Sequence, residues 1–293
     1  ILPFVLADLG KPLGKKENLM NIRFRLSGAA LLAMAAQGAL ASGVLPNQIF
    51  MDKSFTDDAS LQQTRMTMAY DAVNYWSSSG GNTGGNRLAQ YDGSGNLLNS
   101  YAPGLDMRSI FTGAGGTVFA RQFNDPTIYR QTAPGVFTAH VSLVGGTLDA
   151  QSAVVLNSAG TEYGAQSAGT LSRWDLLGNH LGNVSLSGFG SMNNEGNYPA
   201  SRTLAAWNGY YLTYAQQYVS AWDLSGNRVG MAELVGAGTS FDSDFSFSYA
   251  ADGRLWVVDG AGQTWRGYTI VPEPASMAAL GLGALAMIRR RRR

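Results

Sequence analysis

Cysteine is absent from this 293-residue sequence, and histidine occurs only twice. Without cysteine the chain forms no disulfide, has no thiol nucleophile and ligates no metal through sulfur. His140 and His180 fall in equivalent outer strands of the repeats described below, so we do not expect them to meet. No G-x-S-x-G turn supports a Ser-His-Asp triad. The sequence therefore predicts a domain stabilised by packing, with no cofactor, no metal centre and no catalytic residue.

Charged residues are also scarce, at 14% of the chain, and the net charge of +1 is misleading. Five arginines stand at the very C-terminus, and acidic residues exceed basic ones between the two terminal segments. A basic footprint for nucleic acid is therefore missing. Asp242-Ser243-Asp244 could bind calcium, but EF-hand spacing and its distal glutamate are absent, which favours a surface loop.

Long apolar runs are missing except near the two ends. On the N-terminal side, the basic stretch Met20–Arg25 precedes an apolar core, Leu26–Ala36. Ala39 and Ala41 supply the small residues of a signal-peptidase site. We therefore predict a signal peptide over residues 20–41, with Ser42 as the first residue of the mature chain.

The residues before Met20 fit a signal peptide poorly, because such a peptide begins close to its charged region. We interpret residues 1–19 as an upstream extension, from upstream translation or a misplaced start. The alternative is a longer basic region that uses Lys11, Lys15 and Lys16.

The second apolar run, Ala275–Ile288, is rich in Ala, Gly and Met. As a helix it would span about 21 Å, against roughly 30 Å of hydrocarbon in a bilayer. Pro272 and Pro274 keep the preceding segment extended. The arginines that follow form a positive-inside stop: Arg289, Arg290, Arg291, Arg292 and Arg293. A short, weakly hydrophobic helix followed by five arginines is typical of a segment that anchors the chain in the membrane only temporarily. The alternative is an ordinary C-terminal anchor helix.

Val271-Pro272-Glu273-Pro274-Ala275-Ser276, the apolar run and the terminal arginines together resemble the PEP-CTERM sorting signal. The resemblance covers residues 271–293, with its three parts in the right order at the end of the sequence. It implies recognition and cleavage near Pro-Glu-Pro by an exosortase, a membrane-embedded cysteine transpeptidase-like enzyme. It also implies export by a Gram-negative bacterium that makes extracellular polysaccharide. The tail says nothing about the domain before it.

Between the terminal segments, Gly, Asn and Asp interrupt short apolar runs every eight to twelve residues, which predicts an all-β domain over 42–270. Residues 88–97, 171–180 and 219–228 resemble one another, since each holds an aromatic-Asp pair followed by Gly-Asn. A degenerate copy spans 128–137, and a truncated one begins at 263. We expect Asp92, Asp175 and Asp223 to stabilise their turns. Trp174, Trp222 and Trp265 should pack between adjacent units, the alternative being stacking platforms for sugars.

A second strand-turn-strand unit precedes each copy, at 66–77, 109–123, 152–166, 203–216 and 245–259. Two hairpins make a four-stranded, blade-sized unit. The sequence therefore predicts a five-bladed β-propeller with blades at 66–104, 109–145, 152–188, 203–236 and 245–270. A signal helix and a short C-terminal hydrophobic helix flank it. The glycine-rich stretch Gly80–Gly85 lacks the residues of a phosphate loop and is interpreted as a flexible connection.

The last unit shows three strands, at Phe245–Tyr249, Arg254–Val258 and Gln263–Ile270. A missing outer strand would leave an exposed sheet edge. We expect Val44–Phe50 to supply the fourth strand and close the ring. The alternative is that Asn47–Gln62 forms a loose linker.

Propellers usually place ligands at the channel mouth, among the loops that lead into the innermost strands. Arg65, Arg108, Arg202 and Asp244 occupy those positions roughly in register. The longest such loop, Ser187–Ser201, adds Asn193, Asn194, Glu195 and Tyr198. Such a ring could hold an anionic sugar or a carboxylated polymer, and the alternative is a set of solvated rim residues.

Three functions stay open for an exported protein of this kind. The first is a non-enzymatic cell-surface or matrix protein, sorted by exosortase and associated with extracellular polysaccharide in a biofilm. The second is a carbohydrate-binding propeller lectin. The third, a glycoside hydrolase or polysaccharide lyase, would need converging carboxylates, for which Asp149, Glu195 and Asp244 are the candidates.

Overall fold

The computed structural model describes residues 43–58, 64–81, 85–260 and 263–271. The predicted signal peptide with Ala39, Ala41 and Ser42, and the tail beyond Val271, lie outside these residues. Within the described ranges, no helix has the length and hydropathy needed to span a bilayer.

The described part is all-β, as predicted, and three of its sheets have four strands each in simple meander order. The first sheet contains β2 (Thr64–Tyr70), β3 (Tyr75–Gly80), β4 (Leu88–Tyr91) and β5 (Leu97–Tyr101). The second contains β6 (Met107–Thr112), β7 (Val118–Gln122), β8 (Thr127–Ala133) and β9 (Val136–Ser142). The third contains β10 (Val154–Leu156), β11 (Glu162–Ser167), β12 (Thr170–Asp175) and β13 (His180–Ser185).

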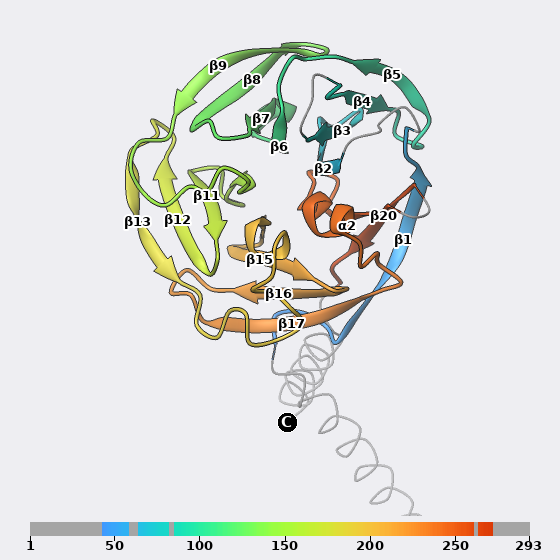
Figure 1. Ribbon diagram of the computed structural model, residues 1–293. Helices are drawn as coiled ribbons and strands as arrows, with labels where there is room; N and C mark the ends of the chain where they lie inside the picture. The colour runs from blue at the N-terminus through green and yellow to red at the C-terminus, as the bar shows by residue number, and fades with distance from the viewer. Residues whose placement is uncertain (1–42, 59–63, 82–84, 261–262, 272–293) are drawn as a thin grey trace, which may run out of the picture. The chain divides into compact units, whose positions relative to one another are not determined.

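The fourth sheet has eight strands and consists of two four-stranded halves joined at their outer strands β17 and β1. One half contains β14 (Ala205–Trp207), β15 (Tyr210–Ala215), β16 (Tyr218–Trp222) and β17 (Arg228–Val235). The other half contains β18 (Ser248–Tyr249), β19 (Arg254–Asp259), β20 (Thr264–Thr269) and β1 (Gln48–Thr56). The sheets surround a common centre, with β5, β9, β13, β17 and β1 at the periphery, which is the arrangement of a β-propeller (Figure 1).

Burial follows this arrangement from the centre outward. The inner strand β2 is buried over Arg65–Ala69, whereas the outer strand β9 is mostly exposed. The hydrophobic core lies between neighbouring sheets. Phe111 and Ile128 of the second sheet, for example, pack in one cluster with Val154, Tyr163 and Trp174 of the third. Trp174, Trp222 and Trp265 are fully buried in three such clusters, so their predicted packing role is confirmed and the stacking-platform alternative is wrong.

The predicted turn residues are also confirmed. The carboxylate of Asp175 accepts hydrogen bonds from the backbone amides of Leu177 and Asn179 and from the Asn179 side chain, at 2.8–2.9 Å. Asp92 and Asp223 make the equivalent bonds in their own turns. In the turn of Asp223, Gly226 lies in the left-handed region of backbone conformation, with φ of +83°. A side chain there would collide with the Ser185 carbonyl, so the turn needs glycine.

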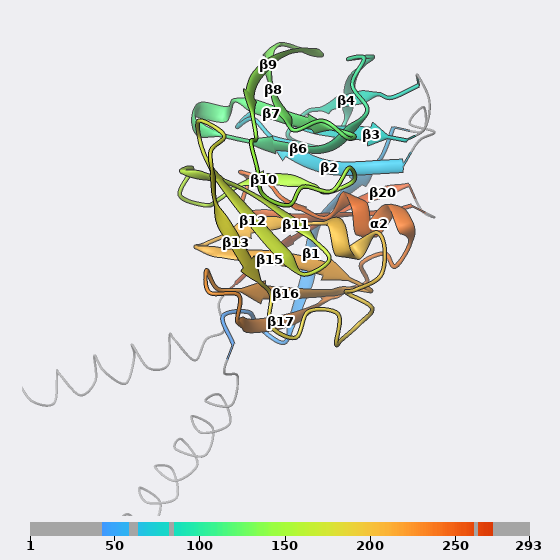
Figure 2. The same ribbon diagram turned by 60° about the vertical axis from the view of Figure 1, so that its left-hand side comes forward.

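The N-terminal strand does close the last sheet, but the predicted segment was wrong. Met51–Thr56 pairs antiparallel with Thr264–Tyr268 of β20, and a register shift occurs between Met51 and Lys53. Gln48–Phe50, in contrast, pairs parallel with Glu233–Val235 of β17. β1 therefore changes partner halfway along its length and joins the two halves of the eight-stranded sheet (Figure 2).

Two further predictions fail where the chain enters the last sheet. Residues Phe241–Ser246 form helix α2, so the expected strand Phe245–Tyr249 is reduced to β18. Ser240 and Ser243 cap this helix reciprocally through their hydroxyls and backbone amides, and Ser243 and Asp244 are buried, so 242–244 is not a surface loop. Of the predicted flexible connection Gly80–Gly85, residues 82–84 lie outside the described residues, so it stays a prediction there. Gly80 itself ends β3, where a Cβ would collide with the Met107 carbonyl, so glycine permits a close approach at this position.

Candidate functional site

The four residues predicted for the channel mouth do lie where the chain leads into the innermost strands. Arg65 is on β2, Arg108 on β6, Arg202 on the 3-10 helix η2 (Ala200–Arg202) before β14, and Asp244 on α2 before β18. They do not form one cationic ring.

Each of the three arginines has a carboxylate partner of its own. Arg65 Nε lies 2.6 Å from Asp57 Oδ2, and Arg202 Nε lies 3.1 Å from Asp149 Oδ1. Arg108 contacts both carboxylate oxygens of Asp106, with Nη2 3.0 Å from Oδ2. Because a paired arginine exerts a weak net field on a ligand, the mouth is far less positive than the sequence alone suggests.

Arg108 is buried and its position is fixed on several sides. Its Nε donates to Gln151 Oε1 at 2.5 Å, and Nη1 donates to the Met107 carbonyl at 3.0 Å. The guanidinium carbon stands 4.9 Å from the centre of the Phe123 ring, within the range of a cation–π contact. The Arg108–Asp106 pair is thus a preformed polar group held against an aromatic face.

Three aromatic rings stand beside this pair. The Tyr198 ring centre lies 5.6 Å from Phe241 and 5.5 Å from Phe245, and the two phenylalanines are 5.1 Å apart, all in edge-to-face geometry. Tyr198 and Phe241 are half exposed, whereas Phe245 is buried. Burial raises the pKa of Tyr198, so its hydroxyl stays protonated at neutral pH. We call these three residues the aromatic cap.

The aromatic cap and the Arg108–Asp106 pair line one pocket of about 650 Å³, here called the mouth pocket. Its lining also includes Gln122, Phe123 and Gln151. Of the residues predicted for the mouth, Arg108 and Tyr198 line this pocket. A sequence signal for the cap existed in Phe241 and Phe245, but Phe245 was assigned to the predicted strand Phe245–Tyr249 and Phe241 was given no role.

The carboxylates predicted for an enzyme are held by separate partners. Asp149 is paired with Arg202. Glu195 is buried and accepts hydrogen bonds from Ser220 Oγ and Arg228 Nη2, both at 2.5 Å, on the outer strands β16 and β17. Asn193 of the same loop also contacts β17, through Met231. Burial raises the pKa of Asp244 to about 7, opposed by a hydrogen bond from the Gln216 backbone. Among the described residues, no group of three His, Asp or Glu side chains could hold a metal ion.

The two histidines contact different residues and do not form a common site. His180 Nε2 is 2.8 Å from Asn183 Oδ1 on β13, and the His140 ring on β9 packs 5.3 Å from Phe119. They lie in different sheets.

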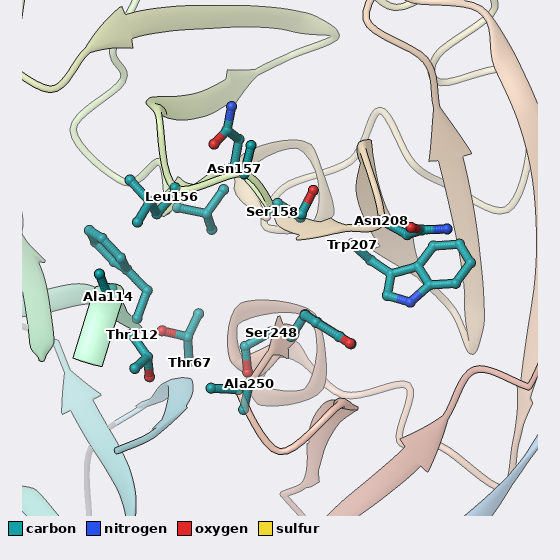
Figure 3. Close-up of a pocket in the computed structure, with 18 of the residues that line it drawn as sticks. Thr67, Thr112, Ala114, Leu156, Asn157, Ser158, Trp207, Asn208, Ser248 and Ala250 are labelled. Atoms are coloured by element: carbon teal, nitrogen blue, oxygen red, sulfur yellow. The ribbon is translucent and has the colours of Figure 1, made fainter. Parts of the chain in front are cut away.

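A larger cavity of about 1070 Å³ opens at the opposite ends of the innermost strands, among the turns that follow β6, β10, β14 and β18. Figure 3 shows Thr67, Thr112, Leu156, Ser158, Ser248 and Ala250 around this opening. Its hydroxyls bond to neighbouring backbone: Thr67 Oγ1 accepts from Ile110 N at 2.6 Å, and Ser248 Oγ accepts from Met68 N at 3.0 Å. These hydroxyls hold the inner strands together, so this cavity offers fewer groups to a ligand than its size suggests.

Comparisons with known proteins identify the tail. Residues 271–293 match the PEP-CTERM protein-sorting motif, as the sequence resemblance predicted. The match supports an exported protein that is sorted by an exosortase. No curated protein matches the sequence.

Several solved structures show a likeness to the domain. A catalytically inactive virginiamycin B lyase from Staphylococcus aureus, solved with quinupristin, has a TM-score of 0.39 and 10% identity over 71% of this chain, and the match spans only 66% of the lyase. A gluconolactonase from Xanthomonas campestris has a TM-score of 0.45 and 11% identity over 78% of this chain and 98% of its own. A streptogramin B lyase has a TM-score of 0.40 and 13% identity over 79% and 85%. At these values the likeness assigns neither an activity nor a ligand to this chain.

Proposed function

We propose that this protein is an exported cell-surface or extracellular protein of a Gram-negative bacterium, released from the inner membrane by an exosortase. The observation that carries the proposal is the sorting motif at 271–293. A signal peptide over 20–41 would start export, with cleavage after Ala41. The apolar run and the arginines would then hold the precursor until Pro272-Glu273-Pro274 is recognised.

The domain that remains after both cleavages is, in this proposal, a five-bladed propeller over residues 42–270. We count the eight-stranded sheet as two blades, because each half has four strands: β14–β17 in one, and β18–β20 completed by the N-terminal strand β1 in the other. The parallel pairing of β1 with β17 joins the two halves only at their outer edge. A ring closed by β1 leaves neither end of the domain as an open sheet edge, which suits a protein exposed outside the cell.

We propose a non-enzymatic role for the domain, retained near extracellular polysaccharide in a biofilm. The separate partners of Asp149, Glu195 and Asp244 support this role over that of a glycoside hydrolase or lyase, which needs two carboxylates facing one substrate. A second candidate is a carbohydrate-binding propeller, and the exposed aromatic cap favours it.

Cell fractionation tests the sorting proposal. Replacing Pro272, Glu273 and Pro274 by alanine should leave the precursor in the inner membrane, because the recognition segment is lost. Pro134→Ala is the matched control: it changes an exposed proline between β8 and β9 and should reach the surface normally. Surface delivery of the triple variant at the wild-type level would contradict exosortase sorting.

A further inference from the structure

We propose that the mouth pocket binds an uncharged saccharide, with Tyr198 and Phe241 as the contact surface for the sugar ring. This deepens the carbohydrate-binding candidate above and rests on it for the class of ligand. It is independent of sorting, because the pocket is formed within the β-domain alone.

The first support is the exposure of the aromatic cap. Tyr198 is 50% exposed and Phe241 is 49% exposed, in contact with each other and with buried Phe245. A cluster of exposed aromatic side chains costs solvation free energy and commonly marks a binding surface. The edge-to-face contacts fix the rings before a ligand arrives, so little side-chain entropy is lost on binding. A flat aromatic face matches the apolar C–H face of a pyranose ring.

The second support is the set of polar groups that line the mouth pocket together with the cap. A sugar presents hydroxyls that both donate and accept, so its site needs acceptors and donors at fixed positions. Asp106 Oδ1 already accepts from Gly81 N and Arg108 Nη1, so Oδ2, which among the described residues accepts only from Arg108 Nη2, is the oxygen that can accept from a sugar. The side-chain amide nitrogen of Gln151 supplies a donor, while its oxygen is held by Arg108. Because Arg108 is buried and bonded on several sides, these groups are positioned before binding.

Charge selects the kind of saccharide. Within the mouth pocket the Arg108 cation is matched by the Asp106 anion, and the neighbouring arginines Arg65 and Arg202 are matched by Asp57 and Asp149. A uronate carboxylate would therefore meet no unpaired arginine in the lining, and the charge-matched Arg108–Asp106 pair would give it little net attraction. The proposal thus favours an uncharged saccharide over the anionic sugar or carboxylated polymer that the sequence left open.

The size of the pocket fits a short stretch of sugar chain. A volume of about 650 Å³ lies within the usual range for small-molecule sites, roughly 300–1,000 Å³. Tyr198 reaches the pocket from the long loop between β13 and β14, and Phe241 from α2 in the next connection. Two connections thus deliver aromatic rings to the mouth pocket.

Calorimetry on the full chain tests the proposal. Because the full chain includes the apolar run Ala275–Ile288, it is measured in detergent. That detergent must not carry a sugar head group, which would compete for the pocket. The probes are oligosaccharides of glucose, galactose, mannose and N-acetylglucosamine, and uronate oligosaccharides of equal length. We expect at least one uncharged series to bind, with an affinity that changes little between low and high salt, and the uronates to bind more weakly.

Matched variants locate the site. Phe241→Ala and Tyr198→Ala should each weaken binding on the order of tenfold, since a truncated aromatic contact costs about 1–2 kcal/mol. Phe50→Ala is the control, because Phe50 is 65% exposed on β1 and does not line the pocket. Tyr198→Phe keeps the ring and should retain most of the affinity if stacking dominates. Melting curves check that each variant is folded.

Any of these results would overturn the proposal: no binding of any uncharged series, preferential and salt-sensitive binding of uronates, or equal effects of Phe241→Ala and Phe50→Ala. Preferential binding of an unrelated peptide at the cap would also do so. Failure here leaves the sorting proposal intact, because that proposal is tested by the fate of the tail.

Discussion

The indole nitrogen of Trp265 donates a hydrogen bond of 2.9 Å to the carboxylate of Asp57, although 208 residues separate them in the chain. Asp57 directly follows β1, and the same carboxylate also accepts from Tyr91 Oη at 2.9 Å and from Arg65 Nε at 2.6 Å. One buried side chain therefore ties the closing strand to β20, to β4 and to the innermost strand β2 of the first sheet.

Replacing Asp57 should accordingly be costly. Asp57→Ala removes the acceptor of three buried donors and leaves Arg65 buried beside them, so we expect a loss of about 3–5 kcal/mol in the free energy of unfolding. Asp52→Asn is the control, since Asp52 also pairs with an arginine but is much more exposed. It should cost no more than about 1 kcal/mol. Urea denaturation measures both, and equal losses would contradict the role of Asp57.

The closing strand itself can be tested by two phenylalanines on β1. Phe55 is buried, and its ring centre lies 5.0 Å from Tyr91 and 5.3 Å from Trp256, which belong to different sheets. Phe55→Ala should cost about 3–5 kcal/mol because it leaves a cavity between these sheets. Phe50→Ala, on the exposed part of the same strand, should cost almost nothing. Thermal melts that show similar midpoints for the two variants would rule out a structural closure by β1.

Asp244 predicts a specific pH dependence of stability. Burial raises its pKa in the folded protein to about 7, above the ordinary value of 3.8. Between about pH 4 and pH 7 the unfolded chain therefore ionises while the folded protein keeps the proton, so stability falls as pH rises through this window. Burial also raises the pKa of Asp242 on the same helix, although Arg65 opposes the shift.

Asp244→Asn should remove most of this fall. The loss in the free energy of unfolding between pH 5 and pH 8 should be smaller in the variant than in wild type, by on the order of 1–3 kcal/mol. Asp223→Asn is the control. Hydrogen bonds from Asn227, chiefly from its side chain, lower the pKa of exposed Asp223, so its titration lies below this window. Denaturation at both pH values measures the slope, and an unchanged slope in Asp244→Asn would contradict the assignment.

The turns and the packing tryptophans could be predicted from the sequence because their causes are local. The Asp and Gly-Asn pattern at Asp175 and Asp223 determines a turn within five residues. The tryptophan directly before each aspartate lies on the strand that leads into the turn and is fully buried. The tail was recognisable for a similar reason, since its three parts are adjacent.

Most of the features that were missed depend on distant contacts. The partner change of β1 depends on where β17 and β20 end, which the sequence of β1 does not show. One miss was local: the alternation of phenylalanine and serine over 245–248 is typical of a strand, but the capping by Ser240 and Ser243 makes the first part helical. Arg108 could be placed at the mouth, but its ion pair with Asp106 and its hydrogen bond to Gln151 required the fold. Glu195 was expected at the mouth and instead pairs with Arg228.

The most direct test of the account is the intact mass of the protein recovered from the native cell surface. We predict that the mature chain begins at Ser42 and lacks the five terminal arginines Arg289, Arg290, Arg291, Arg292 and Arg293, while a strain without its exosortase accumulates precursor that retains them. A surface-exposed protein that carries the complete tail in wild-type cells would contradict processing by an exosortase, and with it the proposed function.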